Sequence, residues 1–188
     1  MCLIGLMVVV TLSVFFVDPG QGLLRVILDF DHWEVYNGSS IINMEKFRVR
    51  KYNRTLSVMN GTGVLTTDLD NRYSYGITFA RSAQGNNQFY AHPIKFSSRP
   101  FCDFINSYYR EFQYLFLNYT NLPFVPNEGL CPFPNGSYWI KDGYIDSSII
   151  PATIPDGIWR CITDLSVTKT GEILFRGIMY VKLTKEIA

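Results

Sequence analysis

The strongest constraint on the fold is a two-residue periodicity that runs from Arg72 to Ser82. Large apolar side chains, including Tyr75, Ile77 and Phe79, occupy every second position, and mostly polar or small residues stand between them. Because successive side chains of a β-strand point to opposite faces of a sheet, the pattern predicts a strand with one buried face. Such a strand needs neighbouring strands and a second apolar layer to cover that face.

Several other segments have the composition or the alternation of strands. They span residues 23–30, 45–59, 88–97, 137–144, 158–167 and 172–184, and the segment 45–59 fits one long strand or two short ones. The pair Asn60-Gly61 is a turn signal that is expected to end the segment 45–59. Pro93 cannot donate to a sheet ladder, so the segment 88–97 is predicted to be an edge strand or to carry a bulge.

The period changes after Arg99, and residues of about 100–117 have the pattern of one amphipathic helix. Phe104, Tyr108 and Phe112 recur at every fourth position, and Pro100 suits the start of a helix. One helix among about seven or eight short strands predicts a mainly β fold, an antiparallel two-sheet β-sandwich or β-cup. The length of 188 residues suits a single domain, which is expected at residues 23–188.

The first residues have the pattern of a signal peptide. Met1 to Val17 form a nearly unbroken apolar run, and Gly20 and Gly22 offer small residues for cleavage. A signal peptide is therefore expected at residues 1–22, which would make the mature protein secreted and extracellular. The segment has no Lys or Arg to form the basic n-region that is usual in a signal peptide, so an uncleaved membrane anchor is the alternative.

Acceptor sites for N-linked glycans support the same compartment. The Asn-x-Ser/Thr pattern occurs at five positions, which are Asn37, Asn53, Asn60, Asn118 and Asn135. One such match is weak, but five in a chain that begins with an apolar segment favour secretion. An asparagine that carries a glycan must lie at the protein surface.

The cysteines permit one bridge in the mature chain. Cys2 falls in the expected signal peptide, which leaves Cys102, Cys131 and Cys161. An odd count allows one disulfide and one leftover thiol, and the spacings fit no zinc pattern. Cys161 stands between strand-forming residues, so burial as a small apolar side chain is favoured over an intermolecular link.

The composition argues against nucleic-acid binding and catalysis. Only 18% of residues are charged and the net charge is +1, which gives no electrostatic footprint for nucleic acid. His32 and His92 are the two histidines, no Gly-x-Ser-x-Gly or phosphate loop occurs, and no cofactor or metal is expected. His92 reads as an ordinary strand residue. Asp68 and Asp70 resemble half a calcium loop without its glycine and glutamate, so a solvated turn is the better interpretation.

Three segments carry a family resemblance. In order, FCDFI (101–105), CPFPNGSY (131–138) and IPDGIWR (154–160) resemble the Cys-Asp-aromatic, Cys-Pro-Phe-x-x-Gly-x-Tyr and Pro-x-x-Gly-aromatic-Arg segments of the ganglioside activator lipid-recognition superfamily. RKYNRTL (50–56) looks like an early strand of that superfamily's large insect branch. Those insect proteins are secreted and mainly of unknown function, and the chemosensory protein B group, implicated in contact-pheromone sensing, is similar. The resemblance covers roughly residues 45–183.

The resemblance implies a β-cup in which two splayed sheets enclose a lipid-sized apolar cavity, with a helix and loops at the rim. It also implies that Cys102 pairs with Cys131. The chain lacks the ganglioside activator's other cysteines, so three further bridges are absent and the rim loops and the ligand are expected to differ.

The candidate cavity residues follow from these strands, the helix and the resemblance. They are Tyr75, Ile77, Phe79, Phe104, Tyr108, Phe112, Trp139, Trp159, Phe175 and Met179. Each would be ordinary core in a solidly packed sandwich, which is the alternative interpretation. Leu122, Phe124 and Val125, on an unusually apolar loop, would form a rim with the tryptophans or a small core beneath the loop.

These expectations lead to one function and two alternatives. The leading hypothesis is a secreted non-enzymatic protein that holds a lipid, fatty acyl chain or long-chain hydrocarbon of pheromone type between two sheets and presents it to a membrane or receptor. The alternative is an extracellular protein-interaction module or receptor co-factor without a ligand, with the tryptophan-bearing loops as its contact surface. A hydrolase is the least favoured.

Overall fold

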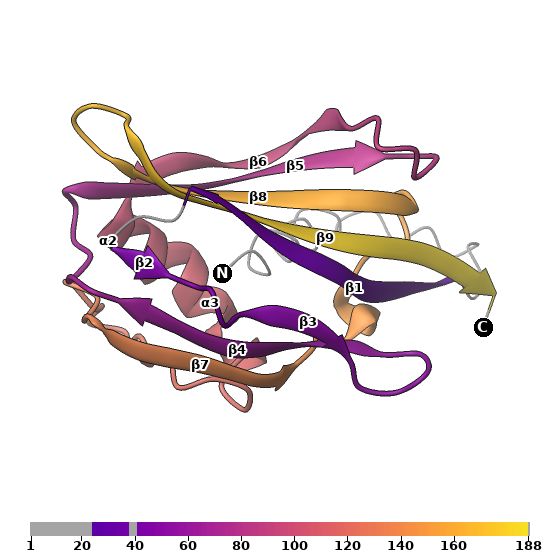
Figure 1. The fold of residues 1–188 in the computed structure, drawn as a ribbon, viewed down its shortest axis with the longest axis horizontal. Coiled ribbons are helices and arrows are strands. Elements are labelled where there is room, and N and C mark those ends of the chain that lie inside the picture. The colour runs from indigo at the N-terminus through magenta and orange to yellow at the C-terminus, as the bar shows by residue number, and fades with distance from the viewer. Residues whose placement is uncertain (1–23, 38–40, 188) are drawn as a thin grey trace.

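The computed structural model describes residues 24–37 and 41–187, and two antiparallel sheets face each other in it (Figure 1). The five-stranded sheet has the order β1 (Leu24–Asn37), β9 (Ile173–Ile187), β8 (Gly157–Val167), β5 (Tyr73–Ser82) and β6 (Tyr90–Pro100). In the second sheet β4 (Ser57–Leu65) is central. One edge of β4 pairs with β2 (Ile42–Asn43) and β3 (Arg48–Lys51), and the other edge pairs with β7 (Gly136–Gly143). The predicted mainly β, two-sheet fold is confirmed.

The expected signal peptide at residues 1–22 lies outside the described residues. In the described ranges, none of the helices combines the length and the apolar character that crossing a membrane requires.

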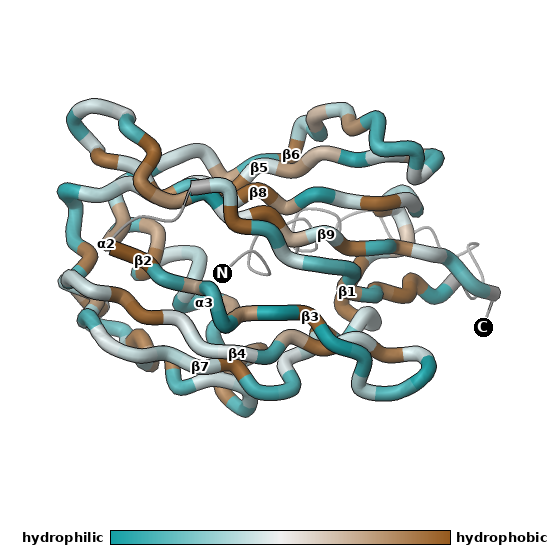
Figure 2. The backbone as a smooth tube through the Cα atoms, in the orientation of Figure 1, coloured by the Kyte–Doolittle hydropathy of each residue, from teal (hydrophilic) through white to brown (hydrophobic). Residues whose placement is uncertain are grey.

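The alternation that predicted β5 places its apolar side chains on the inner face of the larger sheet. Tyr75, Ile77 and Phe79 are buried, and Tyr75 and Phe79 pair with Leu165 and Cys161 of β8. The inner faces of the two sheets meet in one apolar core, whereas the turn between β3 and β4 is hydrophilic (Figure 2). Apolar area removed from water, at about 25 cal/mol per Å², is the main stabilising contribution.

Pro93 has the position that its chemistry predicts. It lies in β6, an edge strand of the larger sheet, and the pairing register between β5 and β6 shifts between Thr78 and Ala80, opposite residues 91–95. The edge position and the bulge are both confirmed, because a residue without an N–H can stand only where no ladder bond is required.

The predicted helix forms in several short pieces between the two layers (Figure 1). It consists of α2 (Phe101–Phe104), a π-helical turn η1 (Ile105–Tyr109), α3 (Arg110–Phe112) and a 3₁₀ turn η2 (Gln113–Leu115). Pro100 is the N-cap residue, and the backbone N–H of Cys102 donates to Oδ1 of Asn71, which satisfies one group of the first turn. A further 3₁₀ turn, η3 (Ser147–Ile149), was not predicted.

The predicted turn at Asn60-Gly61 is wrong, because β4 continues through it to Leu65. Gly61 has a φ of +141°, and a Cβ atom there would overlap the carbonyl oxygen of Lys46. The glycine therefore serves a bulge and a close backbone approach inside a strand. The turn lies earlier, where Oδ1 of Asn53 accepts hydrogen bonds from the backbone N–H groups of Thr55 and Leu56.

The first predicted strand is also longer than expected, because β1 runs on past Phe30 to Asn37. Its pairing with β9 shifts between Phe30 and Trp33. This bulge breaks the alternation that the sequence would otherwise show, so the second half of the strand was not predicted.

Asp29 joins the two sheets at one end of the sandwich. Its carboxylate accepts a hydrogen bond from Nζ of Lys51 at 3.0 Å and one from the backbone N–H of Ser57 at 3.1 Å. These bonds tie β1 of the larger sheet to β3 and β4 of the smaller one.

With Asn in place of Asp29, the free energy of unfolding is expected to fall less on acidification than it does in the wild type. Burial raises the pKa of Asp29, but the hydrogen bonds from Ser57 and Lys51 outweigh it, so the pKa lies below its usual value. The contribution is therefore present above the unfolded pKa and is lost as the pH falls through the folded pKa. Urea unfolding from about pH 6 to pH 3 should show a shallower fall for Asp29→Asn than for the wild type. Glu128→Gln, on an exposed loop, is the control, and equal slopes for all three proteins would contradict the prediction.

Candidate functional site

The two sheets enclose an apolar cavity of about 180 Å³. The larger sheet contributes Tyr75, Leu165 and Met179 to its wall, and the smaller sheet contributes Met59 and Leu65. The helix and the loop after it close one side, with Phe101, Tyr109, Phe116 and Leu122 in the wall. The cavity therefore lies where four parts of the fold meet.

Two glycines of β4 line the cavity. Residues on one face of β4 alternate with outward ones, and Gly61 and Gly63 pair with the inward residues Ile140 and Tyr138 of β7. Thr62, between the glycines, is exposed. A side chain at position 63 would extend along the cavity wall beside Met44, whereas a Cβ at Gly61 would overlap the backbone of Lys46 and Phe47. Asn60-Gly61 was interpreted as a turn, and Gly63 was not singled out from the sequence.

Trp33 forms another part of the wall, and a third glycine makes room for it. Trp33 pairs with Met179, which places its side chain on the inner face. A Cβ atom at Gly177 would overlap the six-membered ring of Trp33, so the indole lies where that side chain would stand. Phe47 packs edge-on against the indole, with ring centroids 5.3 Å apart.

The hydroxyl groups of the cavity wall are bonded to the protein. Tyr138 donates to the carbonyl oxygen of Pro134 at 2.6 Å, and Thr163 donates to that of Gly177 at 3.1 Å. Burial raises the pKa of Tyr109 to about 12, so that phenol stays neutral.

Among the described residues that line the cavity, none carries a charge. An uncharged apolar wall can exclude water and hold an apolar ligand, but it offers no activated nucleophile and no acid–base pair.

The structure divides the predicted cavity residues into two sets. Four of them line the cavity, namely Tyr75, Trp139, Phe175 and Met179. Trp139 alternates with the half-buried Tyr138 and Ile140 and is 42% exposed, so its side chain lies mainly on the outer face of the wall. The other six, which do not line the cavity, are Ile77, Phe79, Phe104, Tyr108, Phe112 and Trp159.

Half of the second set, Phe104, Tyr108 and Phe112, belongs to the helix. Phe104 packs on Tyr75 with ring centroids 4.6 Å apart, and Tyr108 packs on Phe96 at 4.8 Å. The helix therefore covers the inner face of the sheet next to β5 and β6 and fills that half of the sandwich. The cavity occupies the other half, beside β1, β9 and β4.

Trp159 lies in the core away from the cavity. Its Nε1–H donates to the carbonyl oxygen of Pro155 at 3.1 Å, and its ring packs against His92, with ring centroids 4.9 Å apart. His92 is half-buried in β6, and its pKa is lowered by burial and by the charge of Arg81.

The apolar loop after the helix is split between the cavity, the core and the solvent. Leu122 lines the cavity, Phe124 is 60% exposed, and Val125 is buried. The carboxamide of Gln113 bonds both backbone groups of Val125, accepting from its N–H at 2.7 Å and donating to its carbonyl at 2.9 Å. These bonds hold the loop against the helix.

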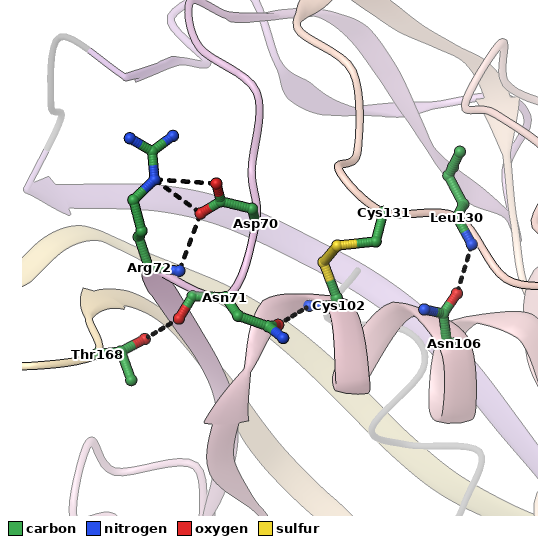
Figure 3. The surroundings of a disulfide bond; sticks show 8 residues. All are labelled: Asp70, Asn71, Arg72, Cys102, Asn106, Leu130, Cys131 and Thr168. Atoms are coloured by element: carbon green, nitrogen blue, oxygen red, sulfur yellow. Dashed lines mark hydrogen bonds and ion pairs between the residues drawn. A yellow bond between two sulfur atoms is a disulfide. The ribbon is translucent and has the colours of Figure 1, made fainter.

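A disulfide joins Cys102 and Cys131, with a Cα–Cα distance of 5.6 Å, as the resemblance implied (Figure 3). It ties the first turn of the helix to the segment before β7. Close to it, Oδ1 of Asn106 accepts a hydrogen bond from the backbone N–H of Leu130 at 2.7 Å. Cys161 is buried as expected, but it is not a free thiol, contrary to the prediction of a leftover one.

The predicted glycosylation sites differ in accessibility. Asn53, Asn118 and Asn135 are exposed. The carboxamide of Asn60 is half-buried and bonds Asp142 through both its nitrogen and its oxygen. Asn37 ends β1, and its side chain lies outside what the structure describes.

The two aspartates of the expected turn bind protein groups. Asp68 accepts hydrogen bonds from Asn135, and Asp70 accepts them from Arg72. Over residues 24–37 and 41–187, no cluster of three or more potential metal ligands occurs.

Comparison with known proteins adds one finding. A family model described as "Protein of unknown function (DUF1091)" matches residues 76–161, from within β5 to within β8. The matched segment contains the helix and the disulfide between Cys102 and Cys131. A search of the curated proteins found no match. Over residues 76–161 the chain is thus similar to a family of unknown function that is commonly tied to a lipid-recognition domain.

Proposed function

We propose that the chain is a secreted, non-enzymatic carrier that holds one hydrophobic ligand in the cavity between its sheets. The observation that carries this proposal is the cavity of about 180 Å³ with an uncharged, apolar wall. An apolar cavity of about 150 Å³ in another protein stays dry and binds benzene. Each methylene group transferred from water into such a site contributes about 0.8 kcal/mol.

The volume favours a slender ligand. Pockets for drug-sized molecules measure about 300–1,000 Å³, whereas this cavity measures about 180 Å³. A single alkyl chain or one ring fits this space better than a lipid with several acyl chains. Val64 and Trp139 line the cavity and are 43% and 42% exposed, so at these residues only the smaller sheet separates the cavity from solvent.

Two further observations support a secreted carrier. The disulfide between Cys102 and Cys131 suits an oxidising compartment, and the family match is tied to a lipid-recognition domain. The finer resemblance to the insect chemosensory protein B group stays part of the proposal, and it would make the ligand a contact-pheromone-type molecule.

The proposal is tested on protein purified from a secreting host. Solvent extraction followed by mass spectrometry is expected to recover a hydrophobic molecule in stoichiometric amount. The ligand-free protein is then expected to take up the fluorescent apolar probe N-phenyl-1-naphthylamine. An unrelated secreted sandwich domain from the same host controls for carry-over. A preparation without bound molecule that also fails to take up the probe would refute the carrier function.

Exposed aromatic residues favour protein interaction as the second candidate function. Phe124 lies on the loop that follows the helix and is 60% exposed. The same loop bonds β7, because Thr120 donates to the carbonyl oxygen of Trp139 and Asn121 accepts from its backbone N–H. A receptor co-factor of this kind would be purified without a bound ligand and would bind its target cells through Phe124. Phe124→Ser would then abolish the binding of labelled protein to those cells.

A further inference from the structure

One short segment closes the cavity where the smaller sheet meets β1, the edge strand of the larger sheet. Residues 44–47, called the strap below, connect β2 to β3 (Figure 1). Met44 and Phe47 of the strap line the cavity, whereas Glu45 and Lys46 between them are exposed. The strap is therefore a wall one chain thick, with apolar side chains inside and charged ones outside. The inference that follows rests on the proposed carrier function and concerns the route by which the ligand enters.

The backbone of the strap is hardly bonded. β2 pairs with β4 as far as Asn43, and β3 begins to pair with β4 at Arg48. Among the described residues, the one backbone hydrogen bond of the strap joins the N–H of Phe47 to the carbonyl oxygen of Met44, at 3.0 Å, and so lies within the strap. An outward movement of the strap would therefore break no backbone hydrogen bond to the rest of the protein.

Both ends of the strap are anchored. Before β2, the carbonyl oxygen of Ile41 accepts a hydrogen bond from the backbone N–H of Thr66 at 2.9 Å. After the strap, Lys51 at the end of β3 bonds Asp29 of β1 at 3.0 Å. The strap thus has two fixed ends and an unbonded middle, which is the construction of a hinged loop.

The wall formed by the helix and its loop is bonded much more closely. Thr120 donates to the carbonyl oxygen of Trp139 at 2.6 Å, and Asn121 accepts from the backbone N–H of Trp139 at 2.6 Å. Asn121 also donates to the carbonyl oxygen of Ser137 at 3.1 Å. The disulfide holds the start of the helix on the same side. An opening there would break several hydrogen bonds, whereas the strap would lose mainly apolar contacts.

Apolar contacts hold the strap closed. Phe47 packs edge-on against Trp33 of β1, with ring centroids 5.3 Å apart. Met44 lies along β4, where its Cγ atom would be 3.4 Å from a Cβ atom at Gly63. Because the hydrophobic effect is non-directional, a hydrophobic ligand can replace such contacts while it passes the same side chains.

We propose that the strap is the gate of the cavity. Residues 44–47 swing outward to admit or release the ligand and close again when Phe47 returns to Trp33. An apolar ligand must wait for this opening in both directions, so the gate sets the rates of binding and release. The affinity depends only on the free and bound states and not on the gate.

A reversible cross-link tests the proposal. In Met44→Cys/Gly63→Cys, the sulfur of residue 44 takes the place of Cγ of Met44, 3.4 Å from Cβ of residue 63, so a disulfide can form between them. The oxidised variant is expected to bind and release N-phenyl-1-naphthylamine roughly tenfold more slowly than its reduced form, with the same Kd. Wild-type protein taken through the same mild reduction controls for the native disulfide, and a non-reducing peptide map checks the pairing.

Three outcomes of this experiment count against the proposals. Equal rates in the oxidised and reduced forms would overturn the gate, because the ligand would then enter past a fixed strap. A change in the dissociation rate alone would overturn it as well, since the cross-link would act on the bound ligand and not on its route. Failure of the wild type and of both forms to bind the probe would instead refute the carrier function.

Two asparagine variants locate the gate without a cross-link. Oδ1 of Asn43 accepts a hydrogen bond from the backbone N–H of Glu45 at 3.0 Å, which supports the turn of the strap. Asn43→Ala is expected to speed probe binding and release equally, by roughly fivefold, the effect of one hydrogen bond. Asn121→Ala, which loosens the loop after the helix, is the matched control and should leave both rates unchanged; neither asparagine lines the cavity. Faster rates in Asn121→Ala but not in Asn43→Ala would place the entry beside the helix and overturn the proposal.

Discussion

Gly63→Leu is expected to lower the affinity for apolar ligands by roughly a hundredfold while leaving the fold intact. Gly63 lies on the inner face of β4 and lines the cavity. A leucine there would occupy space otherwise available to about four carbons of the ligand. At about 0.8 kcal/mol per methylene group, the loss is about 3 kcal/mol, which corresponds to roughly a hundredfold in the dissociation constant.

The backbone at this position tolerates a side chain. The nearest atom to a Cβ at Gly63 would be Cγ of Met44 at 3.4 Å, which is ordinary contact, and Gly63 is not among the glycines with positive φ. An added apolar side chain fills empty space, so the free energy of unfolding should stay equal or rise. Gly61, on the same wall, would not serve, because its φ of +141° disfavours any other residue.

Displacement of N-phenyl-1-naphthylamine measures the affinities, and urea unfolding measures stability. Gly63→Ala should have an intermediate effect, because one methyl group fills less of the cavity. Thr62→Val changes the neighbouring exposed position of the same strand and should bind like the wild type. Wild-type affinity in Gly63→Leu would show that the ligand binds elsewhere.

The sequence predicted which face of each strand is buried, but not which buried residues line the cavity. Tyr75 and Ile77 belong to the same face of β5, yet only Tyr75 lines the cavity. Phe104 of the helix packs on Tyr75, so the space over this face of β5 is shaped by an element that the strand pattern does not describe. Periodicity reports burial along one element and contains no information on the position of another.

The residues that shape the cavity were missed for a related reason. Gly61 was interpreted through the local turn preference of Asn-Gly, and tertiary pairing of β4 with both of its neighbours overrode it. Gly63 was not singled out. Trp33 follows a bulge that interrupts the alternation of β1. Its role depends on Gly177, which lies more than a hundred residues further along the chain. Such a long-range fit between a large ring and a missing side chain leaves no local pattern.

The disulfide was predicted through the family resemblance, and its removal is expected to have the second large effect. The Cys102→Ala/Cys131→Ala double variant should lose about 3–4 kcal/mol of unfolding free energy. The bridge closes a loop with a sequence separation of 29 residues. Without it the unfolded chain gains the freedom that this loop closure removes, so most of the loss arises in the unfolded state.

The folded state of the double variant should keep its local structure and its cavity. Asn106 still accepts a hydrogen bond from Leu130, and Asn71 still accepts one from the N–H of residue 102, so the helix start stays anchored at both places. The cysteines do not line the cavity, although Phe101 and Phe133 beside them do. Guanidinium unfolding should therefore show the lower free energy of unfolding, while probe affinity without denaturant changes less than about threefold, the size of a weak packing effect.

Asn106→Ala, which removes only the neighbouring hydrogen bond, should cost about 1 kcal/mol. A double variant that loses no more than Asn106→Ala would mean that the loop is already restricted in the unfolded chain.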